Sequence, residues 1–164
     1  MTDIVHPTYP NLYRIRALCD IPRHGVLTGD LGGYIESMYN LDGYENNWVA
    51  DDAIVREQAQ ISGDSLVAES ANVSGESYIK NSKVFGNAIV RERATIIDYS
   101  KVYGDAVVEG FSLVTNSSVY DKALVTGLSR IRNTKVHKDL IISGIFGEEQ
   151  YIHWFLTREV IYEW

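Results

Sequence analysis

Residues 49–70 read VADDAIVREQAQISGDSLVAES, and a six-residue spacing runs through them. From Val49 to Ile142, Val or Ile recurs at steps of six, interrupted by three steps of five. β-Branched side chains favour short strands, and a six-residue unit is too small to fold unless it stacks on its neighbours. All 17 anchor positions are Val or Ile: Val49, Val55, Ile61, Val67, Val73, Ile79, Val84, Val90, Ile96, Val102, Val108, Val114, Val119, Val125, Ile131, Val136 and Ile142.

Two further positions of the repeat are restricted. Most anchors are followed after four residues by Ala or Ser, as at Ala53, Ser65 and Ser118, which suits a tight bend. The residue two after each anchor is Gly, Asn or another polar residue, and these types suit turns. Each unit is therefore predicted to be a strand followed by a turn.

The five-residue steps indicate three units per coil. Counted from Val49, the short units are the sixth, twelfth and fifteenth, all multiples of three. The prediction is a triangular prism of nearly six coils, roughly 27 Å long at the usual parallel-strand spacing.

The repeat pattern resembles that of the hexapeptide-repeat proteins. The resemblance implies the fold class, an all-β, left-handed parallel β-helix. The segments YRIRAL (13–18), GDLGGYIES (29–37) and WV (48–49) resemble the N-terminal cap of YdcK-like repeat proteins, which are frequent in phages and prophages.

Both ends of such a helix need cover, because they expose unpaired backbone groups. We expect an N-terminal cap at 1–48, the repeat region at 49–142, and a C-terminal aromatic hairpin or cap at 143–164. A short helix in 143–164, or a role of that segment in oligomerisation, is the alternative. Gly29, Gly32 and Gly33 are expected to serve turns, since GDLGG lacks the lysine and spacing of a phosphate loop.

Composition favours a cytoplasmic protein, in the host cell cytoplasm if a phage encodes it. The sequence shows one cysteine, no secretory signal and no apolar run of membrane-span length. The net charge of -7 divides unevenly, with -8 in residues 1–79, +4 in 80–142 and -3 in 143–164. Such asymmetry can steer partners.

The sequence assembles no catalytic group, and we expect no cofactor or metal. Of four histidines only His137 lies in the repeat, and one coil histidine cannot bind metal as the three histidines of β-helix carbonic anhydrases do. Many hexapeptide-repeat proteins are acyltransferases, so an enzyme using His137 as general base is the alternative.

One predicted face has the pattern of a binding surface. Its outward column ends in aromatic residues and runs beside a column rich in lysine, so it is a candidate for contact with nucleic acid or an acidic partner. The stacked rings could equally serve strand stability alone. The partner-binding candidates are Phe85, Tyr103, Tyr120, His137, Lys83, Lys101 and Lys135.

A second face carries aliphatic residues that need cover, from residues 143–164 or from another subunit. We expect a homo-oligomer, with a dimer favoured over a trimer. The interface candidates are Ile54, Ile89, Val107, Leu124, Ile141, Tyr151, Trp154 and Phe155.

These features favour a non-catalytic, phage- or prophage-type interaction protein that binds a host protein or protein–nucleic-acid complex. One version is an inhibitor of a host nucleic-acid-binding defence system such as CRISPR–Cas, with the acidic cap and early coils docking on a basic surface. A structural assembly protein of a virion is a further alternative.

Overall fold

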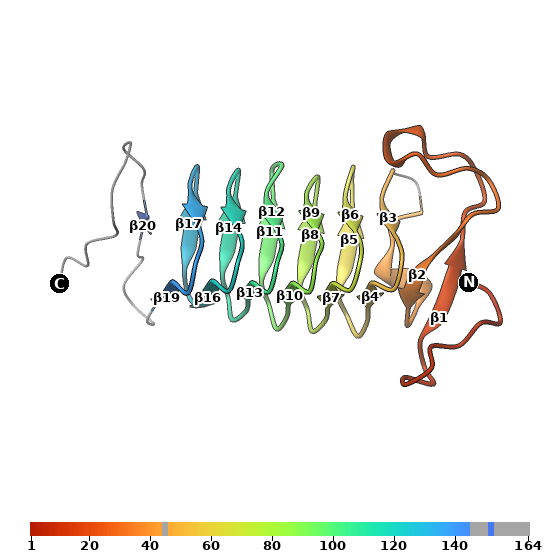
Figure 1. The fold of residues 1–164 in the computed structure, drawn as a ribbon, viewed down its shortest axis with the longest axis horizontal. Coiled ribbons are helices and arrows are strands. Elements are labelled where there is room, and N and C mark those ends of the chain that lie inside the picture. Colours follow the sequence, from red (N-terminus) through yellow and green to blue (C-terminus); the bar gives the residue numbers. More distant parts are fainter. Residues whose placement is uncertain (44–45, 145–150, 153–164) are drawn as a thin grey trace.

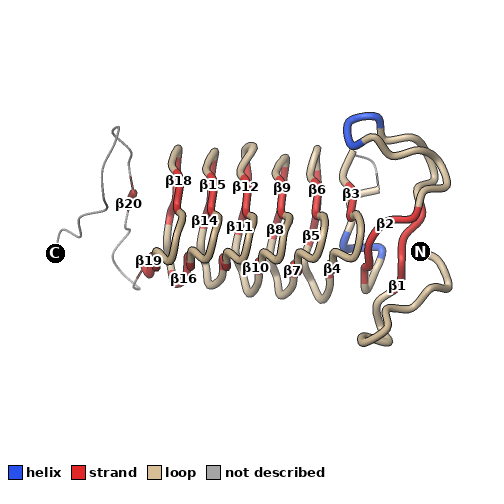
Figure 2. The backbone as a smooth tube through the Cα atoms, viewed as in Figure 1, coloured by secondary structure: helices blue, strands red, loops and turns tan. Residues whose placement is uncertain are grey.

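The chain forms a parallel β-helix of about six coils in the computed structural model, which describes residues 1–43, 46–144 and 151–152 (Figure 1). The coils stack along one axis, with the N-terminal segment at one end. The all-β fold predicted from the repeat is confirmed. The only helices among the described residues are the single 3₁₀ turns η1 (Pro22–His24) and η2 (Met38–Asn40), both in the N-terminal segment (Figure 2).

Three sheets form the sides of the prism. Sheet I contains, in order, β1 (Tyr13–Arg16), β2 (Leu31–Ile35), β4 (Ile54–Val55), β7 (Asn72–Val73), β10 (Ile89–Val90), β13 (Val107–Val108), β16 (Leu124–Gly127) and β19 (Ile141–Gly144). Sheet II contains β5 (Gln60–Ser62), β8 (Tyr78–Lys80), β11 (Thr95–Ile97), β14 (Leu113–Thr115), β17 (Arg130–Arg132) and β20 (Tyr151–Ile152). Sheet III contains β3 (Trp48–Val49), β6 (Leu66–Val67), β9 (Lys83–Val84), β12 (Lys101–Val102), β15 (Ser118–Val119) and β18 (Lys135–Val136).

The anchor residues form the core. Each anchor lies in register with the anchor one coil away, as Val90 does with Val108. None of the 17 anchors is more than 5% exposed, which confirms their predicted inward orientation. Burying a Val or Ile side chain contributes about 1.5–3 kcal/mol, so this column is the main source of stability.

The corners of the prism hold the small residues. Ala53, Ala71 and Ala106, between Sheets III and I, are fully buried. Between Sheets II and III the corner is a ladder of hydroxyl residues: Ser65, Ser82, Ser100, Ser117 and Thr134. In this ladder the backbone N–H of each residue from Ser82 onward donates to the hydroxyl of the residue one coil before it, at 3.1–3.2 Å.

The ladder corrects one expectation about the short units. The buried small residue of the unit that begins at Val114 is Ser117, three positions after the anchor, and Ser118 faces outward in β15. A five-residue unit therefore lacks one residue between its anchor and its corner residue. The corner side chain and the next strand keep their register.

The turns use the left-handed backbone conformation that the sequence predicted two residues after the anchors. Asp51, Glu57 and Asn81 have φ of 54°, 60° and 50°. At Gly110, φ is 73° and an added Cβ would lie 2.6 Å from the Gly127 carbonyl oxygen, so the close stacking of turns also excludes a side chain there.

The coil begins inside the N-terminal segment. β2 pairs parallel to β4 with Ile35 beside Val55, and Leu41 forms a parallel bridge to Ile61. The expectation that Gly32 and Gly33 serve turns is wrong, because both lie in β2. A Cβ at Gly33 would come within 2.5 Å of the Ala53 carbonyl oxygen, so the glycine permits close approach of the first full coil.

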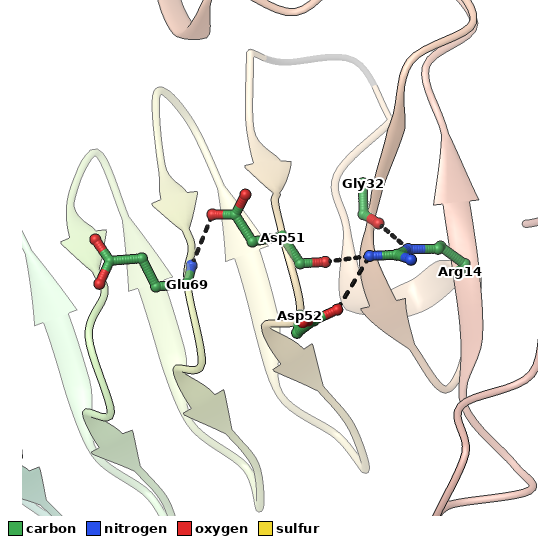
Figure 3. Close-up of polar contacts among 5 residues, drawn as sticks. All are labelled: Arg14, Gly32, Asp51, Asp52 and Glu69. Atoms are coloured by element: carbon green, nitrogen blue, oxygen red, sulfur yellow. Dashed lines mark hydrogen bonds and ion pairs between the residues drawn. The ribbon is translucent and has the colours of Figure 1, made fainter.

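Arg14 clamps the cap onto this coil (Figure 3). Its guanidinium donates to the carbonyl oxygens of Gly32, at 2.8 Å, and Asp51, at 2.7 Å, and pairs with the Asp52 carboxylate at 3.1 Å. One side chain therefore joins β1, β2 and the first turn of the repeat.

At the opposite end, the stack continues past Ile142. β20 pairs parallel to β17, with Tyr151 beside Arg130, and so adds a strand to Sheet II. The rest of the predicted aromatic hairpin, residues 153–164, lies outside the described residues.

Candidate binding faces

Sheet III carries an aromatic ladder made of Phe85, Tyr103, Tyr120 and His137. The centroids of Phe85 and Tyr103 are 4.9 Å apart with an interplanar angle of 1°. Tyr103 and Tyr120 are also 4.9 Å apart, and His137 continues the stack at 5.2 Å. The predicted stacking of this column is confirmed. Its cause is the in-register pairing of β9, β12, β15 and β18, because each ring belongs to the residue that directly follows one of these strands.

The ladder is half-buried, and its rings cover one another. Both faces of Tyr103 and both faces of Tyr120 contact a neighbouring ring. A nucleobase therefore has no free ring face to stack on in the middle of the ladder, so a partner would meet ring edges and hydroxyls. Burial and the neighbouring Tyr120 and Asp121 raise the pKa of Tyr103 above its ordinary value.

A lysine column runs beside the ladder. Lys83 lies in register with Lys101, Ser118 follows, and Lys135 lies beyond it, with all three lysines exposed. Within the described ranges none of these lysines forms an ion pair, whereas five arginines do: Arg14, Arg23, Arg56, Arg91 and Arg93. Like charges on adjacent strands are destabilising, so an anionic partner would relieve the repulsion between Lys83 and Lys101.

Several acids of the early coils have a structural role. The Asp51 carboxylate accepts from the Glu69 N–H at 3.0 Å (Figure 3), and Glu57 accepts from the Gly75 N–H at 2.7 Å. A later turn repeats this type of contact, because the Glu92 carboxylate accepts from the Gly110 N–H at 2.9 Å. These side chains satisfy turn N–H groups one coil away, so part of the acidic charge of residues 1–79 serves the fold.

The aliphatic column on Sheet I is shorter than the sequence indicated. Ile54 is only 9% exposed and packs against Leu12 and Tyr34, so the cap covers it and it is not an interface residue. Ile89, Val107 and Leu124 are half-buried on the outer face, and Ile141 is 56% exposed. Tyr151 lies in β20, whereas Trp154 and Phe155 lie outside the described residues.

A cleft that the sequence did not indicate lies between η1 of the cap and the corner of Sheets II and III. Arg23 and His24 line it from the cap, and Lys83, Tyr99 and Lys101 line it from the coils. Burial lowers the pKa of the His24 imidazole, although its hydrogen bond to the Asn46 backbone opposes the shift. The sequence had no signal for this site, because the cap residues lie about 60 positions or more from the lysines.

Two observations on the described residues bear on catalytic and metal chemistry. His137 stacks on Tyr120, and no carboxylate among those residues is hydrogen bonded to it. No group of three or more His, Cys, Asp or Glu residues in the described ranges has a metal-binding arrangement. In the same part of the chain, no helix has the length and apolar character needed to cross a bilayer.

No protein-family model matches the chain, and no curated protein matches it either.

Proposed function

We propose that this protein is a non-catalytic interaction protein of the phage or prophage type, which binds an anionic surface of a host macromolecule stoichiometrically. The observation that carries the proposal is a column of lysines that form no ion pair with any described residue and that lie beside the aromatic ladder on Sheet III: Lys83, Lys101 and Lys135. The lysines supply charge, and the half-buried ring edges and tyrosine hydroxyls supply contact area that loses little conformational entropy on binding.

The partner we favour is a host protein or protein–nucleic-acid complex in the host cytoplasm. A nucleic-acid-binding defence system such as CRISPR–Cas is one such target, and the protein would act as its inhibitor. Because several acids of the early coils accept hydrogen bonds within the chain, we place the binding face on the lysine-bearing part of Sheet III rather than on those acidic coils. The rigid stack suits this role, since the face is already organised before binding.

Stoichiometric capture tests the proposal. The tagged full-length protein is incubated with host lysate at low salt, and the captured partner is quantified by mass spectrometry. We expect one defined partner, whose recovery falls at least about tenfold at high ionic strength because exposed charges are screened. Failure to recover a partner across several hosts and salt concentrations would contradict the proposal.

Matched charge variants test the face. The triple variant Lys83→Gln, Lys101→Gln, Lys135→Gln removes the lysine column without altering the core. A control of equal charge change, Arg91→Gln, Lys122→Gln, Arg130→Gln, alters bases elsewhere on the coils. The column variant should lose the partner and the control should keep it; equal loss would mean that only the net charge matters.

A further inference from the structure

The cleft between the cap and the coils combines charge and unused hydrogen-bonding groups. Arg23 contributes no net charge, because it pairs with the Asp64 carboxylate at 2.9 Å. Lys83 and Lys101 line the same cleft from adjacent strands, and neither has an ion-pair partner within the described ranges. The cleft therefore carries an excess of about two positive charges when His24 is neutral.

Two further polar groups in the cleft have no hydrogen-bond partner among the described residues. The Nε2 atom of His24 is buried and has no hydrogen-bond partner among the described residues. Asn81 is oriented by its Oδ1 atom, which accepts from the Asp64 N–H at 3.0 Å. That bond leaves the Asn81 amide N–H groups as donors without a partner in the described part of the chain.

The serine hydroxyls at the base of the cleft are already used. The Ser82 hydroxyl donates to the Lys80 carbonyl oxygen at 2.9 Å, and that of Ser100 donates to Ile97 at 2.6 Å. The available groups are thus two ammonium groups, a side-chain amide and a buried imidazole nitrogen. A buried polar atom without a partner is costly, so the His24 Nε2 atom is better satisfied with a bound ligand than without one.

We propose that this cleft binds a phosphoryl group, with Lys83 and Lys101 as its counter-charges and Asn81 as a neutral donor. Two ammonium groups match the charge of a phosphate near neutral pH, and three oxygens can accept from several donors at once. Protonation of His24 at Nε2 would add a further donor when the anion is present. The inference shares Lys83 and Lys101 with the proposed binding face, but it rests on the cleft that these lysines form with His24 and Asn81 and needs neither Lys135 nor the aromatic ladder.

The test is a titration of the isotope-labelled full-length protein with inorganic phosphate at constant ionic strength, followed by NMR. We expect saturable shifts confined to the His24 ring, the Asn81 side-chain amide and the backbone around Lys83 and Lys101. The pKa of His24 should rise in the bound state. Shifts that do not saturate, or that spread evenly over the lysines, would overturn the proposal.

Paired variants and ligands make the result specific. Lys83→Gln with Lys101→Gln should weaken phosphate binding at least about tenfold, the effect of 1.4 kcal/mol. Lys122→Gln with Lys138→Gln, an equal charge change at exposed positions outside the cleft, should leave it unchanged; equal weakening in both would overturn the proposal. Tighter binding of adenosine monophosphate than of inorganic phosphate identifies a phosphomonoester ligand. Saturation of the same signals by an oligothymidylate without terminal phosphates identifies a nucleic-acid backbone.

Discussion

Arg14 and Asp51 hold the N-terminal cap on the coils, since Nη2 of Arg14 donates to the Asp51 carbonyl oxygen at 2.7 Å. The same side chain also lies over the Tyr34 ring, 4.9 Å from its centroid. The contact matters beyond the cap, because the cap supplies one wall of the proposed phosphoryl site and covers the Ile54 end of the aliphatic column.

Arg14→Ala should destabilise the fold by about 2 kcal/mol, because it removes charge-assisted hydrogen bonds to main-chain carbonyls. Asp52→Asn should cost less than about 0.5 kcal/mol, since its side chain is 76% exposed and the ion pair is a surface pair. Urea denaturation of both variants measures the difference. A loss in Asp52→Asn as large as in Arg14→Ala would show that the ion pair, rather than the carbonyl contacts, holds the cap.

Gly110→Ala should destabilise the stack more than Gly25→Ala. Both glycines have positive φ, but an added Cβ at Gly25 meets nothing within 4 Å, whereas at Gly110 it meets the backbone of Gly127. We expect a loss of about 1 kcal/mol at Gly25 from backbone strain, and about 2 kcal/mol more at Gly110 from the clash. Thermal unfolding of the two variants checks the order, and equal losses would contradict the close stacking of turns.

Ser117→Ala and Ser118→Ala form a matched pair on adjacent residues. Ser117 accepts from the Thr134 N–H at 3.1 Å inside the corner ladder, so its replacement should cost about 1–3 kcal/mol by leaving that buried donor without a partner. Ser118 faces outward, and its replacement should change stability by less than about 0.5 kcal/mol. Chemical denaturation decides between them, and the reverse order would place the wrong serine in the core.

The stability of the protein should fall as pH drops through the ordinary histidine pKa of 6.5, with His24 as one cause. Burial lowers its pKa in the folded state, so the unfolded chain binds the proton first. The free energy of unfolding then decreases with falling pH until folded His24 is itself protonated. A His24→Gln variant should show a smaller decrease in denaturation experiments across this range, and an identical pH profile would contradict the assignment.

We predict that the full-length protein is a homo-oligomer, most simply a dimer, which uses the aliphatic column of Sheet I. Leu124→Glu should weaken the assembly, whereas Leu113→Glu, at a half-buried position on the outer face of Sheet II, should not. Light scattering on the wild type and both variants measures this. A monomeric wild type would refute the prediction, and an oligomeric Leu124→Glu variant would direct attention to residues 143–164.

The sequence by itself determined the repeat architecture and the composition of its faces. Val or Ile at each anchor, a small residue at most corners and a turn-forming residue after each anchor all act locally, and stacking repeats them in register. For the same reason the spacing of Phe85, Tyr103 and Tyr120 sufficed to predict their stacking.

Only the tertiary structure decided how the non-repeating parts meet the coils. The cap covers Ile54, and Gly33 allows the backbone at Ala53 to approach closely. His24 lines the same cleft as Lys83 and Lys101. These relationships join residues distant in sequence through irregular chain, where no period fixes direction or register. They depend on particular contacts such as those of Arg14, because a repeat specifies which residues stack on one another but not which surface a loop from outside the repeat will cover.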